Sequence, residues 1–390
     1  MAKFHTLLFA LLSCAIFPFA QDSEHFFLWP KVFALLGVCV ANLQVLLQAR
    51  YSQQMRIWMN GAGAWFPWLL MVWVATVFAV HPVWSILGHP SRGVGAAWWS
   101  LIALFSISTT AVARFRKELI SAQFDGIQLG CLINCLALIV QSFAGWEARG
   151  FFRHPAHLAG LLLLALAVLM QSSGRSRWQS FTWPLVAVYV IALIGLGYRA
   201  ALIAVPILLI IKIGWRRALP IVISCLIALG IYTSSRQIEP LPAGYEKGPM
   251  YEVVRDWSSD RVWLYTRGIR YFLKSTVIGH GWQGLHIEQA LSQCEDSGGV
   301  TINRVTYRCA DGEKPHNPAQ HSHNLILNKL VETGFLGLFG YGWLLFQLLK
   351  GKISINNGYV LVAYTVWVMF WPEGHYYSWL FYWSLSRDYC

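Results

Sequence analysis

The stretch AHLAGLLLLALAVLMQ, residues 156–171, carries no charged side chain. A bilayer core about 30 Å thick needs about 20 apolar residues per helix, and runs of this kind recur along the whole chain. By that criterion we count about twelve. Their expected extents are residues 4–20, 27–48, 63–80, 95–113, 124–142, 156–171, 180–198, 200–214, 218–233, 334–349, 357–372 and 374–386. The pattern predicts an all-α polytopic membrane protein with about twelve transmembrane helices.

The composition of the 390 residues favours the same class. Hydrophobic residues make up 56% of the chain and charged residues only 12%, whereas soluble domains carry about 25% charged residues. This balance excludes a soluble enzyme, a secreted disulfide scaffold, a coiled coil and a disordered chain. The formal net charge is +12, but the basic residues stand in small groups between apolar stretches. That distribution is typical of membrane orientation and does not indicate a nucleic-acid partner.

The basic groups also predict the orientation of the chain. If the twelve spans are right, they all fall on one side, which the positive-inside rule makes cytoplasmic, so both termini lie inside. The groups are Lys3, Arg50 with Arg56, Arg114 with Arg116 and Lys117, Arg175 with Arg177, Lys212 with Arg216 and Arg217, Lys350 with Lys352, and Arg387. The first stretch is alternatively a secretory signal, but Pro18-Phe19-Ala20 is a poor cleavage site. We expect a retained helix.

One long polar segment interrupts the apolar pattern. Residues 234–333 hold 11 of the 18 acidic and 11 of the 30 basic residues, and loops of this length usually carry function. The expected organisation is therefore helices 1–9 in residues 1–233, a large periplasmic loop in 234–333, and helices 10–12 in 334–390. Apolar residues at helical spacing predict an amphipathic helix over 255–274 at the membrane surface. Cys294 and Cys309 share this loop and are able to pair in an oxidising periplasm.

The residues most suited to chemistry stand at the end of this loop. His323 directly precedes a run of apolar residues at helical spacing, and Ser322 or Asn324 is the expected N-cap. A helix N-terminus disfavours a second proton on an imidazole, and a neutral imidazole is able to act as a general base. The alternative is a helix cap beside interfacial histidines. The residues alone do not decide between the two.

A resemblance to a known family rests on this segment. His323-Asn324, then nine residues, Gly334, two residues and Gly337 resembles the signature of the bacterial O-antigen ligase superfamily, which includes O-antigen polymerases and protein O-oligosaccharyltransferases. Taken together with the looser matches below, the likeness covers about residues 150–340.

Three further segments match this family more loosely. Residues 150–159 are similar to its G-x-F-x-x-P-N-x-x-A stretch, with Ala156 in place of Asn. Residues 197–201 resemble its S-R-G/A step, with Tyr198 in place of Ser. Asp260-Arg261-Val262-Trp263 followed by residues 278–281 resembles its G-R-x-x-x-W … P-L-x-G-x-G segment without the Pro.

The resemblance implies a GT-C-type glycosyltransferase of the bacterial inner membrane, with its active site facing the periplasm. It would pass glycan from an undecaprenyl diphosphate donor to a hydroxyl acceptor, without cofactor or metal and with inversion. His323 would activate the hydroxyl, and Arg199 and Arg261 would hold the diphosphate. Arginine suits that role because its rigid fork of donors matches phosphate oxygens.

Each arginine has a simpler alternative. Arg199 sits between two apolar stretches and is also able to extend to the membrane interface, although the very short connection there favours function. Arg261 is one of four arginines on the amphipathic segment, with Arg255, Arg267 and Arg270. Only the resemblance selects it from that set, so Arg267 and Arg270 remain possible supporting residues.

Other polar residues are weaker candidates. Arg153 and His154 end one apolar span on the external side and are possible donor contacts, and Asn324 is a possible supporting residue. His321 and His323 form a His-x-His pair, but no third ligand has convincing spacing for zinc. Asp22 and Glu24 are more simply an acidic external turn than a metal site.

The most favoured function is an O-antigen ligase acting on the lipid A core, embedded among membrane lipids. An O-antigen polymerase, or a protein O-oligosaccharyltransferase, shares the donor chemistry and is the nearest alternative. A polytopic transporter or flippase is the alternative from another class. Transporters tend to place ionisable residues near the bilayer midplane, whereas here the polar residues gather in one external loop.

Overall fold

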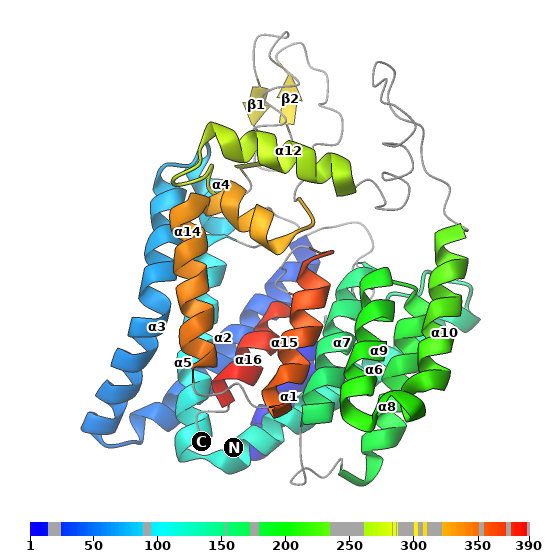
Figure 1. Cartoon of the computed structure of the whole chain (residues 1–390). Coiled ribbons are helices and arrows are strands. Elements are labelled where there is room, and N and C mark those ends of the chain that lie inside the picture. Colours follow the sequence, from blue (N-terminus) through cyan, green and yellow to red (C-terminus); the bar gives the residue numbers. More distant parts are fainter. Residues whose placement is uncertain are drawn as a thin grey trace.

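The computed structural model describes residues 1–14, 25–88, 95–152, 154–171, 179–234, 261–282, 284–285, 287, 300–302, 307–309, 322–350, 355–371 and 376–387. The fold is helical (Figure 1), as predicted. The helices are α1 (Ala2–Ser13), α2 (His25–Leu47), α3 (Tyr51–Val77), α4 (Pro82–Leu87), α5 (Ala96–Phe115), α6 (Lys117–Phe143), α7 (Pro155–Gln171), η1 (Gln179–Phe181), α8 (Thr182–Leu196), α9 (Arg199–Ile213), α10 (Trp215–Ser234), α12 (Arg261–Lys274), α14 (Leu325–Leu349), α15 (Ile355–Val368) and α16 (Ser378–Arg387).

The long polar segment also contains a small hairpin that the all-α prediction lacks. Strands β1 (Val300–Ile302) and β2 (Tyr307–Cys309) pair antiparallel, with Val300 opposite Cys309. Two strands of three residues are stable only as part of a larger structure. Cys294 lies outside the described residues, so its pairing with Cys309 stays a prediction.

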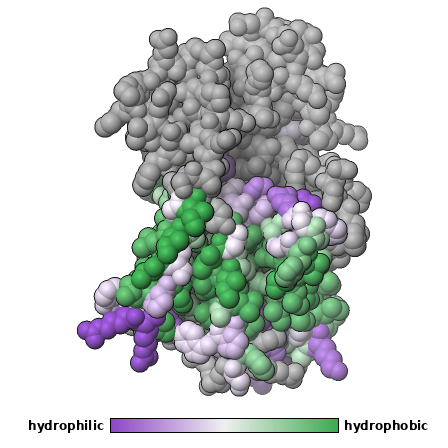
Figure 2. Space-filling model, turned by 90° about the vertical axis from the view of Figure 1, so that its right-hand side faces the viewer, coloured by the Kyte–Doolittle hydropathy of each residue, from purple (hydrophilic) through white to green (hydrophobic). Residues whose placement is uncertain are grey.

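The membrane character of the chain is visible on the outside of the bundle. Exposed apolar side chains include Ile139 on α6, Ile191 on α8 and Leu226 on α10. Figure 2 shows such side chains as a broad apolar band with polar residues above and below it. Helices that bury their polar backbone and expose apolar side chains are suited to lipid, not to water. The chain is therefore a membrane protein.

Within the described residues, three helical segments are both long and apolar enough to cross a bilayer: Pro30–Leu47, Ala96–Phe115 and Lys117–Phe143. Ala2–Ser13, Pro155–Gln171, Thr182–Leu196 and Gly358–Val368 are apolar but shorter. The twelve spans and the GT-C assignment remain predictions.

Helix α3 starts earlier than the hydrophobicity pattern predicts. The expected span begins at residue 63, whereas the helix begins at Tyr51. Its first turns carry Gln53, Gln54 and Arg56, which lower the local hydrophobicity without opposing helix formation. Hydrophobicity therefore locates the lipid-facing part of the helix and misses its polar extension.

The centre of the bundle is built on α7 and α16. Every residue of α7 from Leu158 to Gln171 is buried, and α7 packs against α6, α8, α9, α15 and α16. Small residues permit this close packing: a Cβ on Gly160 would lie 2.7 Å from the Trp367 indole nitrogen. The two ends of the chain lie at one end of the bundle, and α12 lies across the opposite end (Figure 1).

Candidate active site

Trp371, which follows α15, contacts three segments that are distant in sequence. Its ring centroid lies 5.2 Å from that of His323, 5.6 Å from that of His154 and 5.7 Å from that of Tyr198. The Tyr198 hydroxyl oxygen is 3.4 Å from Nδ1 of His154. The segments preceding α7, α9 and α14 therefore meet at one indole. These are three of the segments that the sequence singles out.

His323 is held in place by the residues on either side of it. The Asn324 side chain accepts a hydrogen bond from the Leu327 amide at 3.0 Å and so caps α14. Of the two predicted caps, Ser322 and Asn324, the structure therefore selects Asn324. On the other side, the Ser322 amide and hydroxyl both donate to Oδ1 of Asn328, at 2.8 and 2.6 Å. His323 itself has a φ of 53°, unlike every other non-glycine residue in the described part of the chain. Such a conformation persists only where its surroundings enforce it.

Helix α12 brings Arg261 to the same place. The Arg261 guanidinium carbon lies 5.4 Å from the ring centroid of Phe370, the neighbour of Trp371. One turn later, the Tyr265 hydroxyl donates to the Met369 carbonyl oxygen at 3.4 Å. Burial raises the pKa of Tyr265, and this effect outweighs the opposing effects of Arg261 and of a hydrogen bond with Asn324. The phenol therefore remains a donor at neutral pH. Its hydrogen bond fixes α12 against residues 369–371.

The other arginines of α12 lie further from this contact along the helix. Arg267 is half-buried and Arg270 is exposed, six and nine residues beyond Arg261. Arg255 lies outside the described residues. Contact with Phe370 therefore distinguishes Arg261 from Arg267 and Arg270, a choice that the residues alone do not provide.

Arg199 is the first residue of α9, directly after Tyr198. Gly197 adopts a φ of 70° and ends α8, a left-handed conformation that glycine adopts readily. The reversal lets α9 begin two residues later, which places a half-buried Arg199 beside the Tyr198–His154 contact. A helix N-terminus and a guanidinium both favour an anion at this position. Arg153 lies outside the described residues.

Helix α14, which follows His323 and Asn324, contains a break. Gly334 has a φ of 66° and a ψ of −168° and separates the helix into two parts. Residues 276–281 supply the hydrogen bonds that the break removes. The amides of Phe335 and Leu336 donate to the carbonyl oxygens of Thr276 and Val277 at 2.9 and 3.2 Å.

The same connecting segment, residues 276–281, also pairs with the turn before the break. The amides of His280 and Gly281 donate to the carbonyl oxygens of Val331 and Glu332 at 2.8 and 2.9 Å. The His280 ring is buried, and its Nε2 is 2.7 Å from the Tyr271 carbonyl oxygen. His280 therefore holds the fold together and does not face the site.

Two buried lysines stabilise the elements around the site. Lys329 Nζ lies 4.4 Å from the ring centroid of Trp99 and 4.7 Å from that of Trp282, with Trp68 and Tyr341 at 5.3 and 5.4 Å. A desolvated ammonium over such rings is stabilised by about 2 kcal/mol. This cage attaches the first part of α14 to α3 and α5. Sequence reasoning missed it, because its aromatic residues come from four separate segments.

Lys31 plays a similar role on the other side of the site. Its Nζ donates to the carbonyl oxygens of Leu12 and Tyr376, at 3.2 and 3.3 Å, and lies 4.3 Å from the Phe152 ring centroid. The Tyr376 ring in turn stacks on His157, with centroids 4.1 Å apart. The loop that leads to His154 is thus anchored to the bundle.

A comparison with the sequence models of known protein families gives a match to part of the chain. The sequence model of the family described as O-antigen ligase matches residues 154–342. This segment, just under half of the chain, is similar to the O-antigen ligase family. No curated protein matches the chain. Family members are membrane glycosyltransferase-like enzymes that act as ligases or polymerases.

The O-antigen ligase match contains most of the gathered residues. It begins at His154 and includes Tyr198, Arg199, Arg261 and His323. It ends before Trp371, on which these segments converge. The site is therefore completed by a residue from outside the matched segment. Its signal in the sequence is weak, because Trp371 is one of 20 tryptophans and aromatic residues are common at membrane interfaces.

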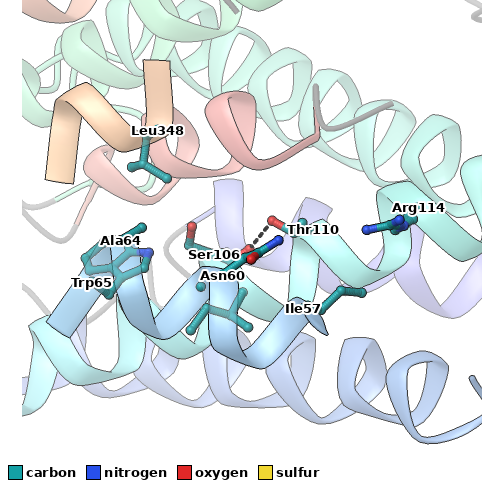
Figure 3. Close-up of a pocket in the computed structure, with 10 residues that line it drawn as sticks. Ile57, Asn60, Ala64, Trp65, Ser106, Thr110, Arg114 and Leu348 are labelled. Carbon is teal, nitrogen blue, oxygen red and sulfur yellow. Dashed lines mark hydrogen bonds between the residues drawn. The ribbon is translucent and has the colours of Figure 1, made fainter. Parts of the chain in front are cut away.

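No metal cluster marks a second active site in the described part of the chain. Among the residues that the structure describes, no three His, Cys, Asp or Glu side chains are grouped to hold a metal. His321, Asp22 and Glu24 lie outside those residues, so metal independence stays a prediction. The cavity in Figure 3 has a volume of about 30 Å³ and is lined by Ile57, Asn60 and Arg114 among others. It holds about one water and lies near the end that carries the termini.

Proposed function

We propose that this chain is an O-antigen ligase. It transfers glycan from undecaprenyl diphosphate to a hydroxyl group of the lipid A core, on the periplasmic face of the bacterial inner membrane. The observation that supports this proposal most is the convergence of His323, Arg261 and the Tyr198–Arg199 step on residues 370–371 and His154. A base and cationic groups at one end of an apolar bundle suit a reaction between two membrane lipids.

In the proposed reaction His323 accepts the proton of the acceptor hydroxyl. The hydroxyl oxygen attacks the anomeric carbon of the donor sugar as the bond from that carbon to the diphosphate oxygen breaks. The electron pair leaves with undecaprenyl diphosphate, and the attack from the opposite face inverts the anomeric centre. Arg199 and Arg261 stabilise the negative charge that develops on the diphosphate. Preorganised charges of this kind are usually the largest contribution to catalysis.

The position of the site favours catalysis over transport. The segment that carries His323 lies at the end of the bundle opposite the termini, beside α12 (Figure 1). Transport sites tend to lie near the bilayer midplane between repeated helices. A site at one end is suited to a headgroup reaction in one leaflet.

Deletion of the gene, followed by gel analysis of lipopolysaccharide, tests this function. A ligase predicts loss of the long-chain bands together with accumulation of long lipid-linked glycan. The wild-type gene restores the bands, and the His323→Ala gene does not, although its product remains in the membrane. Accumulation of lipopolysaccharide with a single repeat identifies a polymerase instead. Unchanged lipopolysaccharide contradicts both assignments.

A further inference from the structure

An apolar groove runs along the outside of the bundle between α6 and α8. Its volume is about 500 Å³, within the range of about 300–1,000 Å³ that is typical of ligand pockets. Leu138 and Ile139 on α6 face Ile191 and Ala192 on α8 across it. Ile139 and Ile191 are exposed, so the groove opens towards the membrane and not into the protein interior.

A side-chain contact joins the two helices beside the groove. The Tyr189 hydroxyl, next to the lining residue Val188, donates to Oε1 of Gln128 at 2.8 Å and joins α8 to α6. The lining then extends along α8 from Val188 to Leu196, a length of about 12 Å for helical residues. This is most of the roughly 15 Å depth of one leaflet of the hydrocarbon core.

Both walls of the groove lead directly to the candidate active site. The α8 wall ends at Leu196, two residues before Tyr198. The other wall continues from α6 through Ala148 into the loop that ends at His154. Tyr198 and His154 contact each other at 3.4 Å. The two sides therefore meet at the residues beside Arg199.

The loop at the top of the groove is firmly held. The Gln141 side chain accepts hydrogen bonds from the amides of Arg149 and Gly150, at 2.9 and 2.8 Å, and donates to the Gly150 carbonyl oxygen at 2.8 Å. The Asn134 side chain accepts from the Phe151 amide at 3.1 Å. A fixed rim is the arrangement expected of a preformed binding site.

We infer that this groove binds the isoprenoid chain of the lipid diphosphate donor, with the diphosphate beside Tyr198 and Arg199. The inference rests on the proposed function, which supplies an anionic lipid as substrate. An apolar groove that leads to a guanidinium and a helix N-terminus is complementary to a hydrocarbon chain with an anionic head. An ordinary bilayer phospholipid is the competing occupant.

Gly195 offers a direct way to fill the groove. It lines the groove on α8, and a Cβ added there meets no atom within 4 Å. Gly195→Trp therefore places an indole in the groove without displacing backbone. Gly230 on α10 is the matched control, because it is also an exposed helical glycine with open space around its Cα. Gly230→Trp leaves the groove unchanged.

The test measures binding of two diphosphates to the full chain in nanodiscs. Undecaprenyl diphosphate carries the long chain, and dimethylallyl diphosphate carries a single isoprene unit. The wild type is expected to bind the long-chain ligand more tightly. Gly195→Trp raises the Kd for undecaprenyl diphosphate at least about tenfold, the effect of releasing about two methylene groups. It leaves the Kd for dimethylallyl diphosphate unchanged, and Gly230→Trp alters neither value.

The remaining outcomes overturn the inference in distinguishable ways. If the Gly195→Trp variant binds the long chain as the wild type does, or loses both ligands equally, the chain does not occupy this groove. If native mass spectrometry shows that the variant loses only a phospholipid, the groove holds a bilayer lipid. A wild type that binds neither diphosphate contradicts the proposed function itself, and the inference with it.

Discussion

At the scale of single residues, Trp371 connects the parts of the site. Its half-buried ring contacts His323, His154 and Tyr198, so it sets the distance between the proposed base and the segment that holds Arg199. A misplacement of about 1 Å is enough to slow an enzymatic step about a hundredfold. The positions of these groups therefore matter as much as their chemistry.

Removal of the indole is expected to affect transfer more than folding. We predict that Trp371→Ala lowers the rate of glycan transfer at least about tenfold, because His323 and His154 lose their shared support. Trp371→Phe keeps an aromatic ring there and retains most of the rate. Trp146→Ala, which removes an exposed indole, is the control and leaves the rate unchanged. Wild-type transfer by Trp371→Ala shows that Trp371 does not organise the site.

The arginines of α12 provide a second test at this scale. We predict that Arg261→Ala raises the KM for the lipid diphosphate about tenfold to a hundredfold, since a hydrogen bond to a charged group contributes about 1.5–3 kcal/mol. Arg270→Ala, on the same helix but exposed, is expected to keep the wild-type KM. Kinetics of the two variants at varied donor concentration measure this difference. Equal effects contradict the assignment of Arg261.

At the scale of elements, the broken helix α14 places His323. Its N-terminal part runs across the end of the bundle and its C-terminal part runs along it (Figure 1). The sequence predicts a helix after His323, and Asn324, one of the two expected caps, caps it. The break is not predictable from hydrophobicity, because residues 276–281 replace the lost hydrogen bonds from far away in the sequence. The family signature marks Gly334 without explaining it.

The backbone conformation of Gly334 explains why this position needs glycine, and a substitution there tests the explanation. A φ of 66° with a ψ of −168° is open essentially to glycine alone, and a Cβ there would collide with the Val277 carbonyl. We predict that Gly334→Ala destabilises the protein by more than about 2 kcal/mol and abolishes transfer. In the same helix, Gly342 has open space around its Cα. Gly342→Ala is therefore expected to maintain or raise the thermal unfolding temperature in detergent, and an equal loss in both variants contradicts this account.

At the scale of the whole molecule, the chain termini and the candidate site are far apart. The termini lie at one end of the helical bundle, and α12 and the site lie at the other (Figure 1). The positive-inside pattern predicts the same separation, because charge and length act locally and are visible in the sequence. The contacts around Trp371, Lys329 and Lys31 cannot be predicted from the sequence, because each joins segments that only the folded bundle brings together.

Labelling from outside intact spheroplasts tests the orientation. We predict that a membrane-impermeant maleimide labels Arg270→Cys on α12 and does not label Tyr51→Cys, which is exposed at the opposite end of the bundle. The unsubstituted chain gives the background, and permeabilised cells show that both sites are reactive. Labelling of Tyr51→Cys alone reverses the orientation and places the site in the cytoplasm.

The most direct test of the central claim is glycan transfer by the purified chain, with His323→Ala as the comparison. The assay combines an undecaprenyl diphosphate-linked glycan, a lipid A core acceptor and the full-length protein in nanodiscs. We predict transfer by the wild type, including in the presence of a chelator. The His323→Ala variant is expected to bind the donor normally and to transfer at least about a hundredfold more slowly, the usual contribution of a general base. Transfer at the wild-type rate by this variant contradicts the account.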